Sequence, residues 1–194
     1  MKFYFIRHWR TEANLTGKMA KNYDEADIID EYPEGWEDRV GCHIPDRNYI
    51  LSSPAKRCLQ TCELLFKRAP TAIMKDFGEF DCAALGRRKF WEMTQAAFEK
   101  LVKLKPEDME KRVHSVLTTL PVFLKNEGIK NCVVISHGMF IRYVYHYLTG
   151  NKGISAYDVI NSKGFEFSNL DMLVYDTETK QVEVYRYDDK KMFC

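Results

Sequence analysis

Short apolar stretches of strand length alternate along the chain with amphipathic segments of helical spacing. Residues of the strand type occupy positions 3–6, 49–51, 72–74 and 132–135, and helical patterns lie between them. Strands that alternate with helices are typical of a mostly parallel sheet, because parallel neighbours need a crossover connection. The pattern therefore predicts an α/β fold.

Two of the helical segments have recognisable ends. After Pro54, apolar residues recur at positions i, i+3, i+4 and i+7, which predicts a helix with Ser53 as its N-cap and Pro54 as its first residue. A longer pattern covers residues 106–126, begins with acidic residues and stops before Gly128. Pro121 lies inside this second pattern, and we expect a kink there.

The last part of the chain has a different pattern. Residues 170–175 and 182–187 have the composition of strands, and the polar connector 176–180 between them predicts an antiparallel hairpin. We therefore expect a three-layer α/β sandwich with a mostly parallel central sheet, helices on both faces and an antiparallel C-terminal edge. No repeat, low-complexity tract or linker divides the sequence, so residues 1–194 are expected to form one domain.

Composition and charge exclude several classes of protein. Of the 194 residues, 45% are hydrophobic and 29% are charged, which suits a globular protein with a sizeable core. The 29 basic and 28 acidic residues nearly cancel, so we expect neither nucleic acid nor an acidic membrane as a partner. No apolar run reaches the roughly 18 residues of a membrane span. Arg7 interrupts the apolar start of the chain, so we expect no signal peptide and a cytoplasmic protein. The six cysteines lack paired spacing, which indicates reduced thiols and no metal site.

Basic side chains follow three of the predicted strands. Arg7 and His8 follow the first strand, Arg57 lies in the helix after the second, and His137 follows the fourth. In an open α/β sheet, ligands bind outside the carboxyl ends of the strands, so we expect these four side chains to meet. The guanidinium group stays protonated and presents a planar set of donors, which suits an oxyanion with several oxygens. The sequence therefore predicts a phosphate pocket.

Three motifs extend this prediction. Residues 5–14 (Phe-Ile-Arg-His-Trp-Arg-Thr-Glu-Ala-Asn) resemble the R-H-G-x-T-x-x-N signature of the histidine phosphatase superfamily, in its phosphoglycerate-mutase-like branch. Residues 52–61 resemble the S-S-P-x-x-R-x-x-Q-T segment of that family, and residues 136–138 match its third motif, Ser-His-Gly. The resemblance implies that His8 is the nucleophile that becomes phosphorylated. It also implies residues that bind the phosphoryl oxygens, namely Arg7, Arg57 and His137, assisted by Asn14 and the backbone of Gly138.

The chemistry of these residues agrees with the roles that the resemblance implies. A neutral imidazole can attack phosphorus and leave again, while fixed cations hold the phosphoryl oxygens, so no metal ion or other cofactor is expected. The leaving oxygen needs a proton donor, and in this family a carboxylic acid after the third strand supplies it. Glu79 best matches that acid in spacing, and Asp81 is the second choice.

The chain departs from the family pattern at two places. Trp9 stands beside the nucleophile, where the family has a small residue, and must either line the substrate pocket or force a local backbone change. An acidic stretch from Asp24 to Asp38 replaces the usual start of a helix. We expect this stretch to be a solvated loop rather than a recognition surface for an amine-bearing substrate.

The preferred function is that of a metal-independent phosphatase acting on a small-molecule phosphomonoester. A phosphoglycerate-mutase-type transferase is the first alternative, although the segment from Thr61 to Glu79 is shorter than the insertion that such mutases carry. A protein that binds a phosphorylated ligand without turnover is the second. Cysteine-dependent phosphatases use C-x5-R, which occurs at Cys62–Arg68, within the predicted helix, and at Cys82–Arg88. The first occurrence cannot form a loop that cradles phosphate, whereas the second could be a loop that enters a helix, although no buried strand leads into Cys82.

Overall fold

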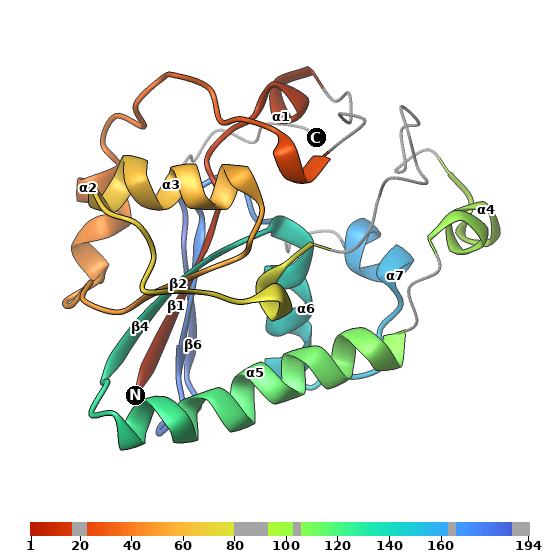
Figure 1. Ribbon diagram of the computed structural model, residues 1–194. Helices are drawn as coiled ribbons and strands as arrows, with labels where there is room; N and C mark the ends of the chain where they lie inside the picture. Colours follow the sequence, from red (N-terminus) through yellow and green to blue (C-terminus); the bar gives the residue numbers. More distant parts are fainter. Residues whose placement is uncertain (17–22, 80–92, 103–105, 163–165, 188–194) are drawn as a thin grey trace.

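The computed structural model contains one six-stranded sheet and describes residues 1–16, 23–79, 93–102, 106–162 and 166–187 (Figure 1). The strand order is β3-β2-β4-β1-β5-β6. The strands are β1 Lys2–Arg7, β2 Ile50–Ser52, β3 Ala72–Ile73, β4 Asn131–Ser136, β5 Met172–Asp176 and β6 Val182–Tyr185.

The first four strands are parallel and the last two form an antiparallel edge. β1 pairs with β4, and β2 pairs with both β3 and β4, all in parallel register. β5 runs antiparallel to β1, and β6 antiparallel to β5. The predicted fold class, a mostly parallel sheet with an antiparallel C-terminal hairpin, is therefore confirmed.

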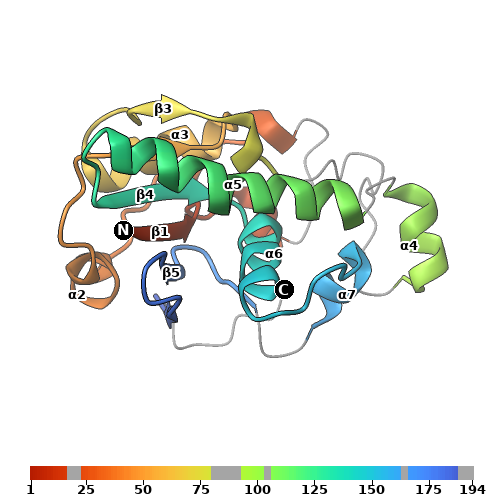
Figure 2. The same cartoon turned by 90° about the horizontal axis from the view of Figure 1, so that it is seen from below.

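Helices cover both faces of this sheet, as Figures 1 and 2 show: α3 lies on one side, and α5 and α6 lie on the other. Short helical turns connect several of the elements. The α-helices are α1 Glu12–Thr16, α2 Trp36–Arg39, α3 Lys56–Phe66, α4 Gln95–Leu101, α5 Pro106–Asn126, α6 Gly138–Leu148 and α7 Ala156–Asn161. The 3₁₀ turns are η1 Tyr23–Glu25, η2 Gly41–His43 and η3 Lys75–Phe77.

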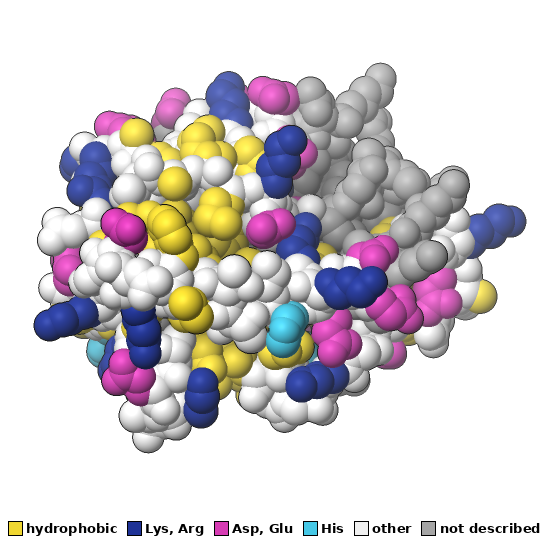
Figure 3. All heavy atoms as spheres, turned by 60° about the horizontal axis from the view of Figure 1, so that its bottom comes forward, with side chains coloured by type: hydrophobic (Ala, Val, Ile, Leu, Met, Phe, Trp, Pro, Cys, Tyr) yellow, Lys and Arg dark blue, Asp and Glu magenta, His cyan; other side chains and the backbone are white. Residues whose placement is uncertain are grey.

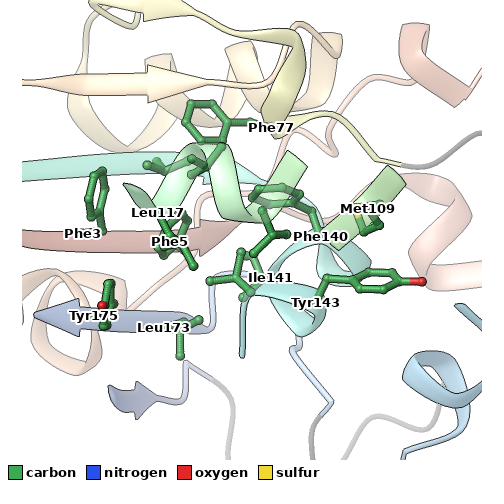
Figure 4. Close-up of a cluster of buried hydrophobic side chains, with 14 of the residues drawn as sticks. Phe3, Phe5, Phe77, Met109, Leu117, Phe140, Ile141, Tyr143, Leu173 and Tyr175 are labelled. Carbon is green, nitrogen blue, oxygen red and sulfur yellow. The ribbon is translucent and has the colours of Figure 1, made fainter. Parts of the chain in front are cut away.

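Alternation along the central strands divides the interior into two cores. Phe3 and Phe5 of β1 pack in a cluster with side chains of α5 and α6, which Figure 4 shows. Tyr4 and Ile6 point to the opposite face and join a second cluster with the apolar side of α3. Because successive side chains of a strand point to opposite faces, a fully buried strand is apolar at every position. This explains the unbroken apolar runs in the sequence.

The start of α3 differs from the prediction, whereas the limits of α5 agree with it. The N-cap of α3 is Ala55, and the helix begins at Lys56, so the predicted cap at Ser53 and first helical position at Pro54 are wrong. The Ser53 hydroxyl accepts a hydrogen bond from Ala55 N at 3.3 Å, within a turn that precedes the helix. The predicted limits of the long helix are confirmed, and α5 continues through Pro121.

The surface that Figure 3 shows, on the side of α5, carries a patch of hydrophobic side chains on one part of that face. Among the described residues, the exposed large hydrophobic side chains are Leu15, Tyr32, Ile73, Val122 and Phe123. Within the same part of the chain, no helix has both the length and the hydropathy to cross a bilayer.

Candidate active site

The parallel register of the sheet brings the predicted site residues together. Arg7 at the end of β1 pairs with Ser136 at the end of β4, and Ser52 of β2 pairs with Ile135. The residues that follow these strands therefore emerge at the same edge of the sheet. His8 follows β1, and His137 follows β4.

His8 is held as a neutral imidazole in one tautomer. Its side chain is buried, and its Nδ1 lies 2.6 Å from the backbone oxygen of Trp9. A carbonyl oxygen only accepts hydrogen bonds, so Nδ1 carries the proton and Nε2 keeps its lone pair. Burial, followed by the charges of Arg57 and Arg7, holds the pKa of His8 well below its usual 6.5.

His137 is neutral as well, with the opposite tautomer. The buried Arg57 donates from Nη2 to His137 Nδ1 at 2.9 Å, so the ring proton lies on Nε2, which donates to Ser53 Oγ at 2.7 Å. Burial, and then the charge of Arg57, lowers the pKa of His137 well below 6.5. The rings of His8 and His137 lie 5.4 Å apart between their centroids. Two neutral imidazoles thus share the pocket with the arginines.

Arg7 lies against the start of α6. Its Nη1 donates to Phe167 O, and its buried Nε has no hydrogen-bond partner among the described residues. A Cβ on Gly138 would come within 3.2 Å of Arg7 Nε, so the absence of a side chain there allows the guanidinium to approach the helix. The first backbone N–H groups of a helix have no partner within the helix, and together with Arg7 they favour an anion.

Glu79 reaches the same helix end from the loop after η3. Its Oε2 accepts a hydrogen bond from Met139 N, in the first turn of α6, at 3.2 Å. Two bonds hold the preceding backbone: Ser136 Oγ donates to Phe77 O at 2.6 Å, and Arg112 Nη2 donates to Gly78 O at 2.8 Å. A carboxyl group is therefore bonded to the start of α6, the helix that follows His137. Asp81, the second choice, lies outside the described residues.

Trp9 has a buried side chain, with 2% of its surface exposed. The indole Nε1 donates to Glu31 O at 2.8 Å, and the ring packs edge-to-face on Tyr187 with 5.7 Å between the centroids. The backbone of Trp9, in contrast, contributes to the site through its carbonyl on His8. The protein thus accommodates this departure from the family pattern by enclosing the large side chain.

The acidic stretch pairs with the first turn of α3. Lys56 Nζ lies 2.8 Å from Asp27, and Arg57 Nη1 lies 3.8 Å from the largely exposed Asp24. Two basic residues at a helix N-terminus oppose the helix dipole, and these carboxylates offset that conflict.

The cysteines that the structure describes give no support to a cysteine-dependent phosphatase. Cys58, Cys62 and Cys132 are buried free thiols, and burial raises the pKa of Cys62 to about 12. Because the thiolate is the nucleophilic form, a thiol with so high a pKa is inert at neutral pH. Cys62 also lies within α3, where no loop can cradle a phosphate. The second C-x5-R occurrence, at Cys82, lies outside the described residues.

Several residues of the site were not predicted in these roles. Ser53 Oγ accepts a hydrogen bond from His137 Nε2, and Thr61 Oγ1 accepts one from Trp9 N at 2.9 Å. Arg112 donates to the backbone of the loop that carries Glu79. Asn169 donates to His8 O at 2.8 Å. Ser53 and Thr61 lie inside a recognised motif, whereas Arg112 and Asn169 lie in segments without one.

Nearly the whole chain matches the profile of one protein family. The profile of the histidine phosphatase superfamily (branch 1) matches residues 3–189, so the chain belongs to this superfamily. The resemblance seen in the three sequence motifs is thereby confirmed.

Particular relatives agree with this assignment. A broad-specificity phosphatase of Saccharomyces cerevisiae is 25% identical over 166 residues, which are 76% of this chain and 70% of the yeast protein. A phosphoserine phosphatase of Entamoeba histolytica, crystallised with phosphoserine, has a TM-score of 0.69 at 16% identity and covers 95% of this chain and 96% of its own. A phosphoglycerate mutase of Bacillus anthracis has a TM-score of 0.66 at 15% identity, with coverages of 95% and 91%. The family and its phosphatases support the predicted enzyme class, a phosphatase.

Proposed function

We propose that this protein hydrolyses a small-molecule phosphomonoester through a phosphohistidine on His8. The observation that carries the proposal is the state of the His8 ring: its proton is held on Nδ1 by Trp9 O, and Nε2 keeps a lone pair beside the two arginines. A buried neutral imidazole among cations is suited to attack a dianionic phosphoryl group and poorly suited to any purely structural ion pair.

The first step transfers the phosphoryl group to the enzyme. The Nε2 lone pair of His8 forms the N–P bond, and the bond between phosphorus and the leaving oxygen breaks. Arg7 and Arg57 hold the phosphoryl oxygens as their charge shifts, and His137, whose Nε2–H donates to Ser53 Oγ, orients Arg57 through its Nδ1. Glu79, protonated when substrate is bound, gives its proton to the leaving oxygen. The negative charge of the bound phosphoryl group favours this protonated form.

The second step returns the enzyme to its first state. The Glu79 carboxylate takes a proton from water, the oxygen of that water attacks phosphorus, and the N–P bond breaks with its electron pair returning to Nε2. The Trp9 carbonyl holds the Nδ1 proton of His8 through both steps, and it stabilises the positive charge that the phosphorylated ring carries. Asn14 and the backbone N–H groups at Gly138 supply further donors to phosphoryl oxygens.

A labelled phosphomonoester tests this mechanism. We expect label on the protein that survives an alkaline quench and is lost in acid, as for a phosphoramidate, and we expect none in His8→Ala. Label that persists in His8→Ala and disappears in Cys82→Ser would replace the histidine mechanism by a cysteine mechanism. Added EDTA should leave turnover unchanged.

A panel of phosphomonoesters, assayed with and without 2,3-bisphosphoglycerate, separates the remaining functions. Phosphate release without the bisphosphate supports the phosphatase. Isomerisation that depends on the bisphosphate would establish a mutase, the activity named for the Bacillus anthracis neighbour. Tight phosphate binding with neither reaction would leave a binding protein.

A further inference from the structure

Asn169 contacts two residues of the active site with one side-chain amide. Its Nδ2 donates to His8 O at 2.8 Å and to Asn14 Oδ1 at 3.3 Å, and 8% of the residue is exposed. Both acceptors belong to the segment that carries the nucleophile. Neither the sequence motifs nor the proposed chemistry uses this residue.

The first of these bonds fixes the peptide group between His8 and Trp9. Asn169 holds the C=O of this peptide, and on its other side Thr61 Oγ1 accepts from the N–H, Trp9 N, at 2.9 Å. The next carbonyl along the chain, Trp9 O, is the one that accepts from His8 Nδ1 at 2.6 Å. Rotation of the first peptide would displace the second carbonyl, and with it the direction of the His8 lone pair.

The second bond orients the amide of Asn14. Asn14 Oδ1 accepts from Thr11 N at 3.0 Å, from Thr11 Oγ1 at 3.1 Å and from Asn169 Nδ2. With three donors around its oxygen, the Asn14 side chain can adopt one of its two flipped orientations only. Its own Nδ2 donors therefore remain for other acceptors, which is the arrangement that a phosphoryl oxygen requires.

The loop that carries Asn169 is itself bound to the nucleophile strand. Leu170 N donates to Arg7 O at 3.0 Å, and Arg7 N donates to Asp171 O at 3.1 Å. Leu170 has a φ of 66°, in the left-handed region that a branched residue seldom adopts. Such a conformation persists only where the surroundings fix it, and here bonds on both sides of Leu170 do so. These bonds fix the backbone next to Asn169, and this fixed backbone positions the Asn169 side-chain amide.

We propose that Asn169 is a positioning residue, which sets the direction of the His8 lone pair through the His8–Trp9 peptide and the donor side of Asn14. This inference rests on the proposed function, because it assigns Asn169 to the phosphorylation of His8. Asparagine suits the task because one neutral NH2 group serves two acceptors without adding charge beside the phosphate. An aspartate at this position would place a carboxylate oxygen against two acceptor oxygens, His8 O and Asn14 Oδ1.

The test compares Asn169→Ala with Asn161→Ala in the full chain. Asn161 is a matched control, because its Nδ2 also donates to a backbone carbonyl at 2.8 Å, that of Tyr157, at an exposed site in α7. Three quantities are measured: the single-turnover rate of His8 phosphorylation by p-nitrophenyl phosphate, the Kd of inorganic phosphate, and the His8 ring tautomer by ¹⁵N NMR. Asn169→Leu, which keeps the shape and lacks the donor, serves if the alanine variant does not fold.

For the Asn169 variant we expect a phosphorylation rate lower by roughly thirtyfold or more, in keeping with the cost of small misplacements at a reacting centre. We expect a phosphate Kd within about threefold of the control, and a mixture of His8 tautomers in place of the Nδ1–H form alone. An unchanged tautomer and a rate equal to that of Asn161→Ala would overturn the proposal, as would a rate that falls only in proportion to phosphate affinity. If the wild-type protein forms no phosphohistidine, the proposed function fails, and the tautomer comparison alone decides the role of Asn169.

Discussion

The proton on His8 Nδ1 determines which ring nitrogen can act on a substrate. The Trp9 carbonyl fixes that proton, and burial with two nearby arginines keeps the ring neutral. Arg57 and Ser53 select the other tautomer for His137, so its Nε2–H faces the Ser53 hydroxyl. The two histidines therefore have different environments, although each follows a strand of the same sheet, and only His8 has its Nε2 lone pair left by these bonds.

We predict that the effect of Glu79→Gln on hydrolysis depends on the leaving group of the substrate. The leaving group of an alkyl phosphate is a poor alkoxide that needs a proton. The leaving group of p-nitrophenyl phosphate is a stabilised phenolate that hardly needs one. Hydrolysis of alkyl phosphates should fall by roughly a hundredfold or more, and hydrolysis of p-nitrophenyl phosphate much less. Steady-state kcat/KM values for both substrates check this.

The comparison variant is Asp81→Asn. It should leave the ratio of the kcat/KM values for the two substrates unchanged. Equal losses on both substrates for Glu79→Gln would show that this carboxyl group orients the pocket without donating a proton. A leaving-group effect in Asp81→Asn alone would move the acid role to Asp81.

At the scale of elements, the sequence predicted which strand and helix ends meet, because apolar runs are local patterns and parallel strands end at one edge. It could not predict partners that belong to distant segments. The bonds from Asn169 to His8 and from Arg112 to Gly78 join residues with no shared local pattern. The assignment of Ser53 as a helix cap failed for a related reason. Its hydroxyl accepts a hydrogen bond from His137, a residue that follows another strand, β4, and the helix starts later.

The turn between β2 and α3 provides a second prediction. Ser53→Ala removes the oxygen acceptor of His137 Nε2–H and leaves this buried donor only the Cys58 sulfur, at 3.5 Å, which costs about 1–3 kcal/mol. We expect kcat/KM to fall by roughly tenfold. Ser52→Ala is the matched control, since the Ser52 hydroxyl is equally buried but donates to a backbone oxygen, Ser53 O, at 2.9 Å. Equal losses of activity in the two variants would refute the role of Ser53.

Across the whole molecule, buried histidines link stability to pH. Burial lowers the pKa values of His8, His137 and His146 below the usual 6.5. In the unfolded chain these rings bind protons at a higher pH than in the folded protein. Their contribution to stability is therefore complete above about pH 6.5 and is lost as the pH falls. Asp171, whose pKa burial raises from 3.8, acts with the opposite sign toward more acidic pH.

We predict that the free energy of unfolding is lower at about pH 5.5 than at about pH 7.5, by up to about 1.4 kcal/mol per pH unit for each histidine that stays neutral. Urea titrations at the two pH values measure it. His146→Asn, outside the phosphate pocket, should reduce the difference. A free energy of unfolding that does not change over this range would contradict the prediction.

The place of β1 in the sheet has a consequence for synthesis of the chain. Lys2 of β1 pairs with Asn131 on one side and with Asp176 on the other. The loop that forms hydrogen bonds with the backbone of Arg7 and His8 precedes β5. The nucleophile directly follows β1, yet both strands that neighbour β1 lie far downstream of it in the sequence, β4 at Asn131–Ser136 and β5 at Met172–Asp176. Domains with such distant pairings fold slowly, because a long loop must close before the contacts form. A growing chain therefore contains every residue of the phosphate pocket before β5 pairs with β1. The enzyme becomes active only once β5 has completed the sheet beside the nucleophile.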